Sequence, residues 1–300
     1  MKEKRSKRQE KRYLLVFLLM GFFGFSQTIG VVKDSLTNQP IPYVSVWVEN
    51  ETIGTTAEEN GEFIINTDDK SKNLVFSVLG YERKVLKVSE SASVFLSPSA
   101  LELGGVTITN KKEKRQVEIG KTKSIIQEAF DNGPRMDAKF FPYQKEYAKT
   151  KWIQKVTILT DSKVENATIK LHLYEVDENG FPGEELLSKD YIVTLRKGIF
   201  KHKVDISEFN IQMPKNGIFV AFEKLIIAKN KLEKTITDYN SNTTKTQITY
   251  SPLVLYNSVE KDYLFSYSGG RWIKLTKEEL NAYSTTRSVY EPNINLILTD

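Results

Sequence analysis

Cysteine is absent from the 300 residues, and histidine occurs only twice, as His172 and His202. The first absence excludes disulfides, thiolate metal sites and cysteine nucleophiles. The second excludes a metal site built from three histidines of one chain. The sequence also lacks the Gly-x-Ser-x-Gly elbow of serine hydrolases and a phosphate-binding glycine loop. These gaps remove several catalytic classes that a sequence motif would reveal.

A positive charge spread over the whole protein is also missing. The chain has 43 Lys and Arg against 38 Asp and Glu, and a net charge of +5 alone invites a nucleic-acid or membrane-surface partner. However, residues 1–26 hold seven of the positive charges and two of the negative ones, which leaves 36 of each on residues 27–300. We therefore expect no nucleic-acid partner.

The basic N-terminus has the layout of a signal peptide. Residues 1–12 are strongly charged, residues 13–25 form an apolar run of 13, and Gly24 and Ser26 place small residues before a cut at Gln27. A span of 13 residues is short for a bilayer, which needs about 20. We expect cleavage between Ser26 and Gln27 and export to the periplasm, the outer-membrane surface or the medium. The alternative is a signal retained as an anchor.

Residues 27–97 carry a series of short strand signals separated by turn residues. Val44, Val46 and Val48 alternate with Ser45 and Trp47, and Asn60-Gly61 is a strong hairpin signal. Seven short strands in about 70 residues predict a small β-sandwich.

Five motifs in this region resemble the carboxypeptidase regulatory-like domain. They are GVVKD at 30–34, PIPYVSV at 40–46, GTT at 54–56, NGEFI at 60–64 and FSVLGYE at 76–82. The resemblance implies a transthyretin-like (prealbumin-like) sandwich that serves as an accessory module and not as a catalyst. Such domains accompany carboxypeptidases and also stand at the N-termini of TonB-dependent outer-membrane transporters.

Residues 98–135 are predicted to connect this sandwich to a second domain. The segment 101–109 resembles the one that follows the domain in TonB-dependent transporters, but only 191 residues come after it. We expect a different protein, one with a possible association with such a transporter. Ile125, Ile126, Ala129 and Phe130 share a helical face, which predicts a short helix over 122–131.

Residues 136–300 are again rich in strand signals. About ten candidate strands with polar connections, among them 167–176 and 247–256, predict a jelly-roll-like β-sandwich, so the fold class is all-β. Residues 229–245 are rich in Lys, Asn and Thr and predict either a long hairpin or a flexible loop. The segment 171–186 is similar to the C-terminal halves of exported proteins that pair two sandwiches, a resemblance that transfers no catalytic residue.

His172 and Glu175 have the His-x-x-Glu spacing of a zinc carboxypeptidase. Their segment alternates as a strand, however, and residues three apart on a strand point to opposite faces. We therefore predict no metal and no cofactor. Asp177 to Gly180 resembles part of a calcium loop without its further ligands, so a tight turn is the better interpretation.

Aromatic residues near the C-terminus are the best candidates for binding. Tyr263 and Tyr267 share one face of a strand, with Arg271 and Trp272 just beyond the Gly269-Gly270 turn. Such a platform can bind a glycan or a protein, or can form one wall of the core. Trp47 has the same two interpretations, as a sugar platform or as the cover of a domain interface.

These observations predict a non-catalytic, exported binding or assembly module of the Gram-negative cell envelope, with a protein or a glycan as ligand. The alternative is an accessory subunit of a peptide- or sugar-processing hydrolase, or such a hydrolase itself. Scarce histidine and the lack of a linked acid–base pair in the sequence weigh against catalysis.

Overall fold

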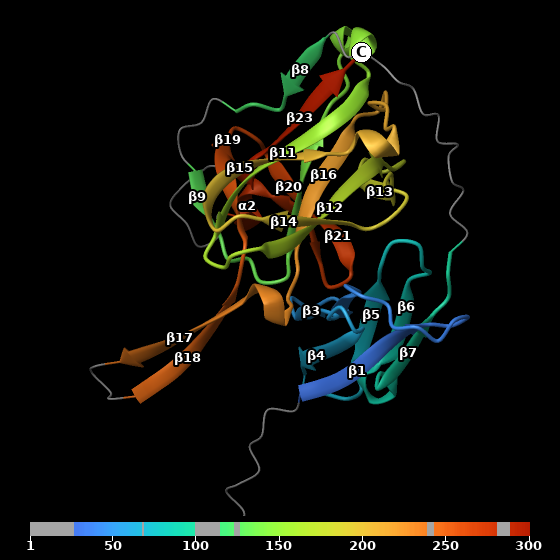
Figure 1. Cartoon of the computed structure of the whole chain (residues 1–300), viewed down its shortest axis with the longest axis vertical. Coiled ribbons are helices and arrows are strands. Elements are labelled where there is room, and N and C mark those ends of the chain that lie inside the picture. Colours follow the sequence, from blue (N-terminus) through green and yellow to red (C-terminus); the bar gives the residue numbers. More distant parts are fainter. Residues whose placement is uncertain (1–26, 68, 100–114, 123–126, 239–242, 281–288) are drawn as a thin grey trace, which may run out of the picture.

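A computed structural model describes residues 27–67, 69–99, 115–122, 127–238, 243–280 and 289–300 (Figure 1). The predicted signal peptide, with Ser26 at its cleavage site, lies outside the described residues, as does the transporter-like segment 101–109. Gln27, the predicted new N-terminus, is the first described residue and begins the first strand.

Seven strands form the first sandwich, as the sequence predicts. One sheet has the order β4-β1-β7 and the other the order β3-β2-β5-β6. Side chains that alternate along each strand fill the space between them, with Val32, Val46, Phe63 and Phe76 almost fully buried. The bounds are β1 Gln27–Asp34, β2 Ser45–Val48, β3 Gly54–Thr56, β4 Glu62–Asn66, β5 Asn73–Ser77, β6 Lys84–Lys87, the turn η2 Val88–Glu90 and β7 Ser93–Leu96.

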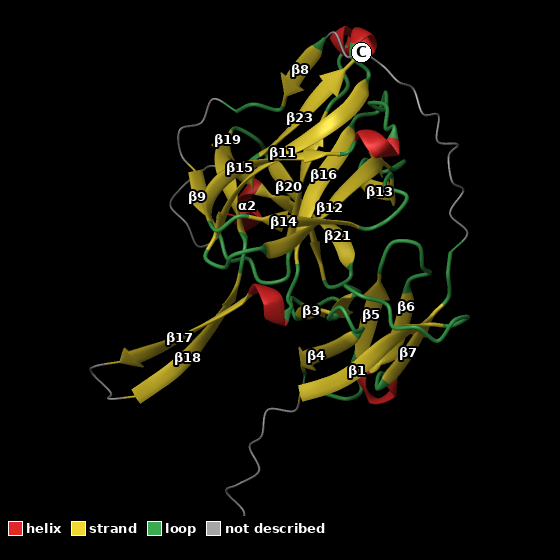
Figure 2. Cartoon of the chain, in the orientation of Figure 1, coloured by secondary structure: helices red, strands yellow, loops and turns green. Residues whose placement is uncertain are grey.

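Two larger sheets form the second sandwich. The order is β13-β12-β16-β10-β20-β21 in one, with β14 also on β12; it is β22-β19-β11-β23-β8 in the other, with β15 on β11 and β9 on β19. Their facing sides enclose an aliphatic core that includes Val156, Leu171, Val220 and Leu296. Strands cover most of the described chain, which confirms the predicted all-β, sandwich-like fold (Figure 2).

The bounds of the first of these sheets are β10 Met136–Phe141, β12 Ala167–Val176, β13 Pro182–Glu185, β14 Tyr191–Leu195, β16 Ile218–Lys224, β20 Tyr263–Ser268 and β21 Arg271–Thr276. Those of the second are β8 Gln116–Ile119, β9 Gln127–Ala129, β11 Trp152–Ser162, β15 Gly198–Asp205, β19 Leu253–Val259, β22 Val289–Pro292 and β23 Ile294–Thr299. Short helical segments are η3 Lys145–Lys149, η4 Ser207–Phe209, η5 Ala228–Asn230 and α2 Lys277–Leu280.

Two local predictions are wrong. The helix expected over 122–131 is contradicted at Gln127–Ala129, which is strand β9 and pairs with β19; residues 123–126 lie outside the described part. The apolar spacing there reflects edge contacts, since Phe130 packs against Tyr256 and Tyr290. The single strand expected over 247–256 is two strands, because the chain turns at Ser251-Pro252.

A two-stranded arm leaves the second sandwich, which confirms the hairpin interpretation of this region. Strands β17 Lys231–Asp238 and β18 Thr243–Tyr250 pair in an unbroken antiparallel register. Figure 1 shows the arm extending away from the body. At its base the Nδ2 atom of the buried Asn230 donates to the carbonyl oxygens of Thr168 and Leu225 at 2.7 and 2.9 Å, which fixes where the arm starts.

Polar contacts join the two sandwiches directly. The backbone N–H of Asn50 donates to the carbonyl of Gly269 at 3.0 Å, and that of Ile226 donates to Thr56 Oγ1, also at 3.0 Å. Strand β2 is buried on both sides because it lies between its own core and the second sandwich. Its valines face the core of the first sandwich, and Trp47 faces the second sandwich. Within the described residues, no helix is long and apolar enough to cross a membrane.

Candidate binding site between the sandwiches

A pocket of about 320 Å³ lies where the two sandwiches meet. The ends of β2 and β5 and the turn after β5 supply one wall, and the outer face of the β12-β16-β10-β20 sheet supplies the other. The side chains that line it are of three kinds. The aromatic ones are Trp47, Tyr81, Tyr174, Tyr267 and Trp272, the charged ones Lys170, His172, Glu185 and Glu223, and the hydroxyl-bearing ones include Ser45, Ser77 and Ser99.

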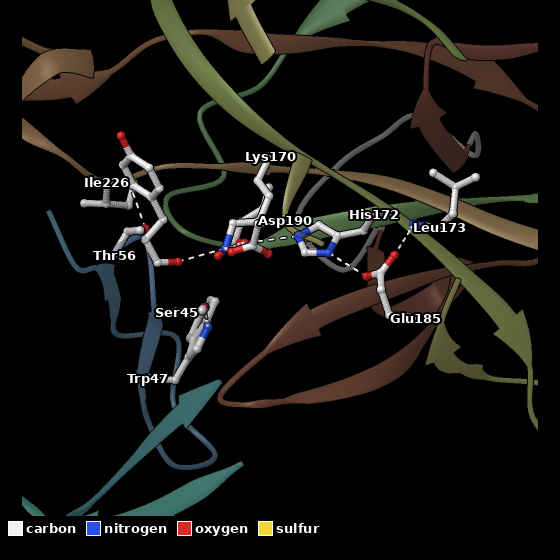
Figure 3. A network of polar contacts seen from close by, with 11 residues as sticks. Ser45, Trp47, Thr56, Lys170, His172, Leu173, Glu185, Asp190 and Ile226 are labelled. Atoms are coloured by element: carbon white, nitrogen blue, oxygen red, sulfur yellow. Dashed lines mark hydrogen bonds and ion pairs between the residues drawn. The ribbon is translucent and has the colours of Figure 1, made fainter. Parts of the chain in front are cut away.

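His172 is the centre of the polar part of the pocket. Its strand, β12, lies between β13 and β16, so one carboxylate reaches it from each neighbour. Nδ1 lies 2.8 Å from Glu185 Oε2, as Figure 3 shows. Nε2 lies 3.1 Å from Glu223 Oε2. The other oxygen of Glu185 accepts the backbone N–H of Leu173 at 2.6 Å. Both nitrogens of the imidazole are therefore occupied.

Lys170 adds a second cation two residues earlier on the same face. Its side chain is 2 % exposed, and Nζ lies 3.4 Å from Asp190 Oδ2 and 3.8 Å from Glu223 Oε2. The same Nζ donates to the carbonyl of Tyr43 in the first sandwich at 2.8 Å. Tyr43 has a φ of 55°, which is uncommon for a residue with a side chain, and its carbonyl oxygen is the one that Lys170 contacts.

These contacts set the charge states of the site. Burial by itself disfavours a charged His172, but the carboxylates of Glu185 and Glu223 outweigh that cost and raise the pKa of the imidazole from 6.5 to about 9. Burial would raise the pKa of Glu223, but Lys170 and His172 reverse this and lower it to about 2. At neutral pH the imidazole is therefore protonated and Glu223 is ionised.

Four aromatic side chains form a continuous row beside the charges. His172 stacks on Tyr174 with ring planes 7° apart, and Tyr174 meets Trp272 edge to face at 5.4 Å. Trp272 in turn meets Tyr267, which meets Trp47 of the first sandwich at 6.0 Å. Gly54 leaves room for that indole, since a Cβ there would lie 2.9 Å from the Trp47 ring.

The structure brings three of the five predicted binding residues to this pocket, namely Trp47, Tyr267 and Trp272. Trp47 is only 2 % exposed and hydrogen-bonds Ser45 through its indole N–H, so it acts as an interface residue and presents no free face to a ligand. Tyr263 and Arg271 are exposed and do not line the pocket. Lys274 lies over the Tyr263 ring at 3.9 Å.

The charge network of the pocket was not predicted from the sequence, where His172 is considered only together with Glu175 and its partners Lys170, Glu185 and Glu223 are not singled out. Alternation along β12 correctly separates His172 from Glu175, which is exposed, so the His-x-x-Glu spacing makes no joint site. The partners of His172 come instead from other strands, 13 and 51 residues away. Among the described residues, no group of three or more His, Asp and Glu side chains is arranged to hold a metal ion.

The turn before β13 is the tight turn that the sequence predicts. Asp177 Oδ1 accepts the backbone N–H groups of Asn179 and Phe181 at 2.9 and 2.8 Å, and Gly180 has φ of 80°. Asp177 is therefore used within the turn, which places Gly183 and Glu185 against the pocket.

Fold and site together define an all-β protein of two sandwiches, the smaller one N-terminal, that share a pocket where they meet. Residues 28–108 match the CarboxypepD_reg-like domain family, so the chain contains a carboxypeptidase regulatory-like domain. Domains of this family are regulatory and non-catalytic. No curated protein is similar enough to the chain to count as a match.

Three solved structures resemble the chain distantly. The cysteine protease and lectin-like domains of a surface layer associated protein of Clostridium difficile have 12% identity and a TM-score of 0.36, over 82% of this chain and 45% of that one. A DUF3823 family protein from Bacteroides ovatus has 11% identity and a TM-score of 0.19, over 77% and 98%. The infectious bursal disease virus Gt strain structure has 10% identity and a TM-score of 0.22, over 91% and 63%. The chain thus spans less than half of the first of these.

Proposed function

We propose that this chain is a non-catalytic binding protein, exported to the cell envelope, and that the pocket between its sandwiches is the ligand site. One observation carries the proposal: both sandwiches contribute walls to a single pocket that combines an aromatic row with paired buried charges. Pockets of this kind, mostly apolar with a few fixed polar groups, are where proteins hold small ligands or the ends of larger ones. Ligand classes that fit are a glycan or a segment of a protein.

The export part of the proposal rests on the N-terminal sequence. A basic stretch, an apolar run of 13 residues and small residues before Gln27 support a signal peptide, and the regulatory-like domain that follows agrees with export. We also propose an association with an outer-membrane transporter. This proposal rests on the resemblance of the first domain to the accessory domain of TonB-dependent transporters.

The charge network supports binding over catalysis. A general base needs a free nitrogen or carboxylate near the substrate, but both nitrogens of His172 already contact carboxylates and Glu223 is held ionised by two cations. Glu185 is occupied on both oxygens, by His172 and by the Leu173 N–H. The hydrolase alternative is tested by incubating the purified protein with peptide and glycoside panels, where turnover abolished by His172→Gln would contradict the proposal.

Blocking the pocket tests the binding function itself. Ser99 lines the pocket and is half-buried, so Ser99→Trp should fill the opening, while Ser188→Trp on an exposed turn is the matched control. Both variants and the parent protein are immobilised and exposed to solubilised envelope fractions and to a glycan array. We expect ligands retained by the parent and by Ser188→Trp to be lost with Ser99→Trp. Equal retention by all three would overturn the pocket as the ligand site.

A further inference from the structure

We propose that the ligand of this pocket is a neutral sugar, taken as the end of an oligosaccharide. The inference rests on the proposed function, that the pocket is a binding site, and goes beyond it by naming the ligand class. Three properties of the lining carry it: the balance of formal charge, the polar groups on the floor, and the geometry of the rings.

The pocket has no net charge to offer a charged ligand. Its charged lining residues are Lys170 and His172 against Glu185 and Glu223, two cations and two anions. Each cation lies within 4 Å of a carboxylate of this set: His172 at 2.8 and 3.1 Å, and Lys170 at 3.8 Å. Lys170 also lies 3.4 Å from the carboxylate of Asp190, which does not line the pocket, so neither cation is left unpaired. A phosphate, a uronic acid or a peptide terminus would need a counter-charge that is already used, and burying an unpaired charge is costly.

The polar floor also disfavours a purely apolar ligand. Covering the carboxylates of Glu185 and Glu223 with hydrocarbon would remove water from groups that retain hydrogen-bonding capacity, since each carboxylate oxygen accepts more than one bond. Ser45, Ser77 and Tyr174 add hydroxyl groups around them. A ligand rich in hydroxyls both donates to carboxylates and accepts from hydroxyls, which matches this mixture.

The aromatic row gives such a ligand an apolar surface to pack on. Trp272 and Tyr174 are both partly exposed, and their planes are 79° apart, so they form two walls of a corner. The face of an aromatic ring carries partial negative charge, which attracts the weakly positive C–H groups on one side of a sugar ring. A sugar can thus lie with its C–H side against the rings while its hydroxyls reach the charged floor.

The size of the pocket limits how much of a glycan it holds. Its volume of about 320 Å³ is at the lower end of the range of about 300–1,000 Å³ that small-ligand pockets occupy. One or two sugar rings at the end of a chain fit this description better than an internal stretch of polymer.

The test measures binding of defined probes to the purified protein by titration calorimetry and tryptophan fluorescence. Neutral probes are cellobiose, xylobiose, maltose, mannobiose and N,N′-diacetylchitobiose; charged probes are digalacturonic acid and the glucosamine disaccharide; trialanine represents peptides. We expect at least one neutral probe to bind, and Trp272→Ala to weaken it on the order of tenfold or more. Tyr263→Ala, exposed and away from the pocket lining, is the control and should bind as the parent does.

A second readout does not depend on the Trp272 variant folding well. The two histidines give separate imidazole signals in NMR spectra, and only His172 lines the pocket. Binding of a neutral probe should shift the His172 signal and leave His202 unchanged.

The outcomes separate the sugar inference from the proposed function. Preferential binding of a charged probe or of trialanine, with the same loss in Trp272→Ala, overturns the sugar inference and leaves the pocket as a binding site. Binding of no probe overturns the sugar inference, and the Ser99→Trp comparison with envelope fractions then decides independently whether the pocket binds anything. If a sugar binds without shifting the His172 imidazole signal, and Trp272→Ala does not weaken that binding, the sugar binds elsewhere and the inference is overturned.

Discussion

The Nζ atom of Lys170, in the second sandwich, donates a hydrogen bond of 2.8 Å to the carbonyl oxygen of Tyr43, in the first. The ammonium group is almost fully buried and also contacts the carboxylates of Asp190 and Glu223. One side chain therefore links a backbone carbonyl of the first sandwich to the charge network of the second. Breaking a buried charge network by removing one member is usually costly, because the remaining charges lose their partner.

Lys170→Met should destabilise the protein by about 3 kcal/mol or more, because it leaves Glu223 and the Tyr43 carbonyl without the ammonium. The measurement is urea unfolding followed by tryptophan fluorescence. Lys189→Met is the matched control: Lys189 pairs with Glu208 on the surface, where both side chains are more than half exposed, and the expected change is below about 1 kcal/mol. Equal effects of the two substitutions would show that Lys170 does not hold the sandwiches together.

The pKa values of the two histidines should lie on opposite sides of the ordinary value of 6.5. His172 has its pKa raised to about 9 by the two carboxylates, while burial, with a smaller contribution from Arg196, lowers the pKa of His202. NMR titration of the imidazole signals measures both, with His202→Gln assigning the pair. A His172 signal that titrates near 6.5 would mean that Glu185 and Glu223 do not bracket the ring in solution.

Stability should depend on pH through His172. Because its folded pKa lies above the unfolded value, protonation favours the folded state: the contribution is complete below about pH 6.5 and is lost as pH rises through about 9. The expected loss is up to about 3 kcal/mol between those limits. Urea unfolding of the parent and of His172→Gln at pH 6, 7.5 and 9.5 separates this group from others, since the variant should show a flatter profile.

Trp47→Ala should cost about 3 kcal/mol or more, because it removes a large side chain that is 2 % exposed and loses the contact with Tyr267. Val85→Ala, at a position 39 % exposed in the same sandwich, should change stability by less than about 1 kcal/mol. Thermal unfolding measures both. A mild effect of Trp47→Ala would indicate that the sandwiches separate easily in solution.

The β17–β18 arm should be removable. Replacing residues 231–250 with a Gly-Gly turn should change stability by no more than about 0.5 kcal/mol, because the Ser251 N–H already lies 2.8 Å from the Asn230 carbonyl and the arm's residues are mostly exposed. By contrast, Asn230→Ala should cost about 2 kcal/mol, since it leaves the buried backbone groups of Thr168 and Leu225 without partners. Unfolding curves of the two variants make the comparison.

Local patterns in the sequence were sufficient for most of the strands. Strand β12 begins and ends at the predicted residues 167 and 176 because it is long and buried, and seven strands in the first sandwich follow from its turn residues and alternation. The helix expected over 122–131 was wrong because a short apolar spacing does not distinguish a helix from an edge strand. What decided that segment was a partner, β19, more than a hundred residues away.

The sequence by itself determined the all-β class, the regulatory-like domain at its start and the separation of His172 from Glu175, since these depend on residue order and on the two-residue period of a strand. Only the tertiary structure decided what His172 contacts. Glu185 and Glu223 reach it because β13 and β16 flank β12, and Lys170 meets Tyr43 because the sandwiches touch there. Strand pairing brings distant residues together, and no local spacing in the chain records which strands will be neighbours.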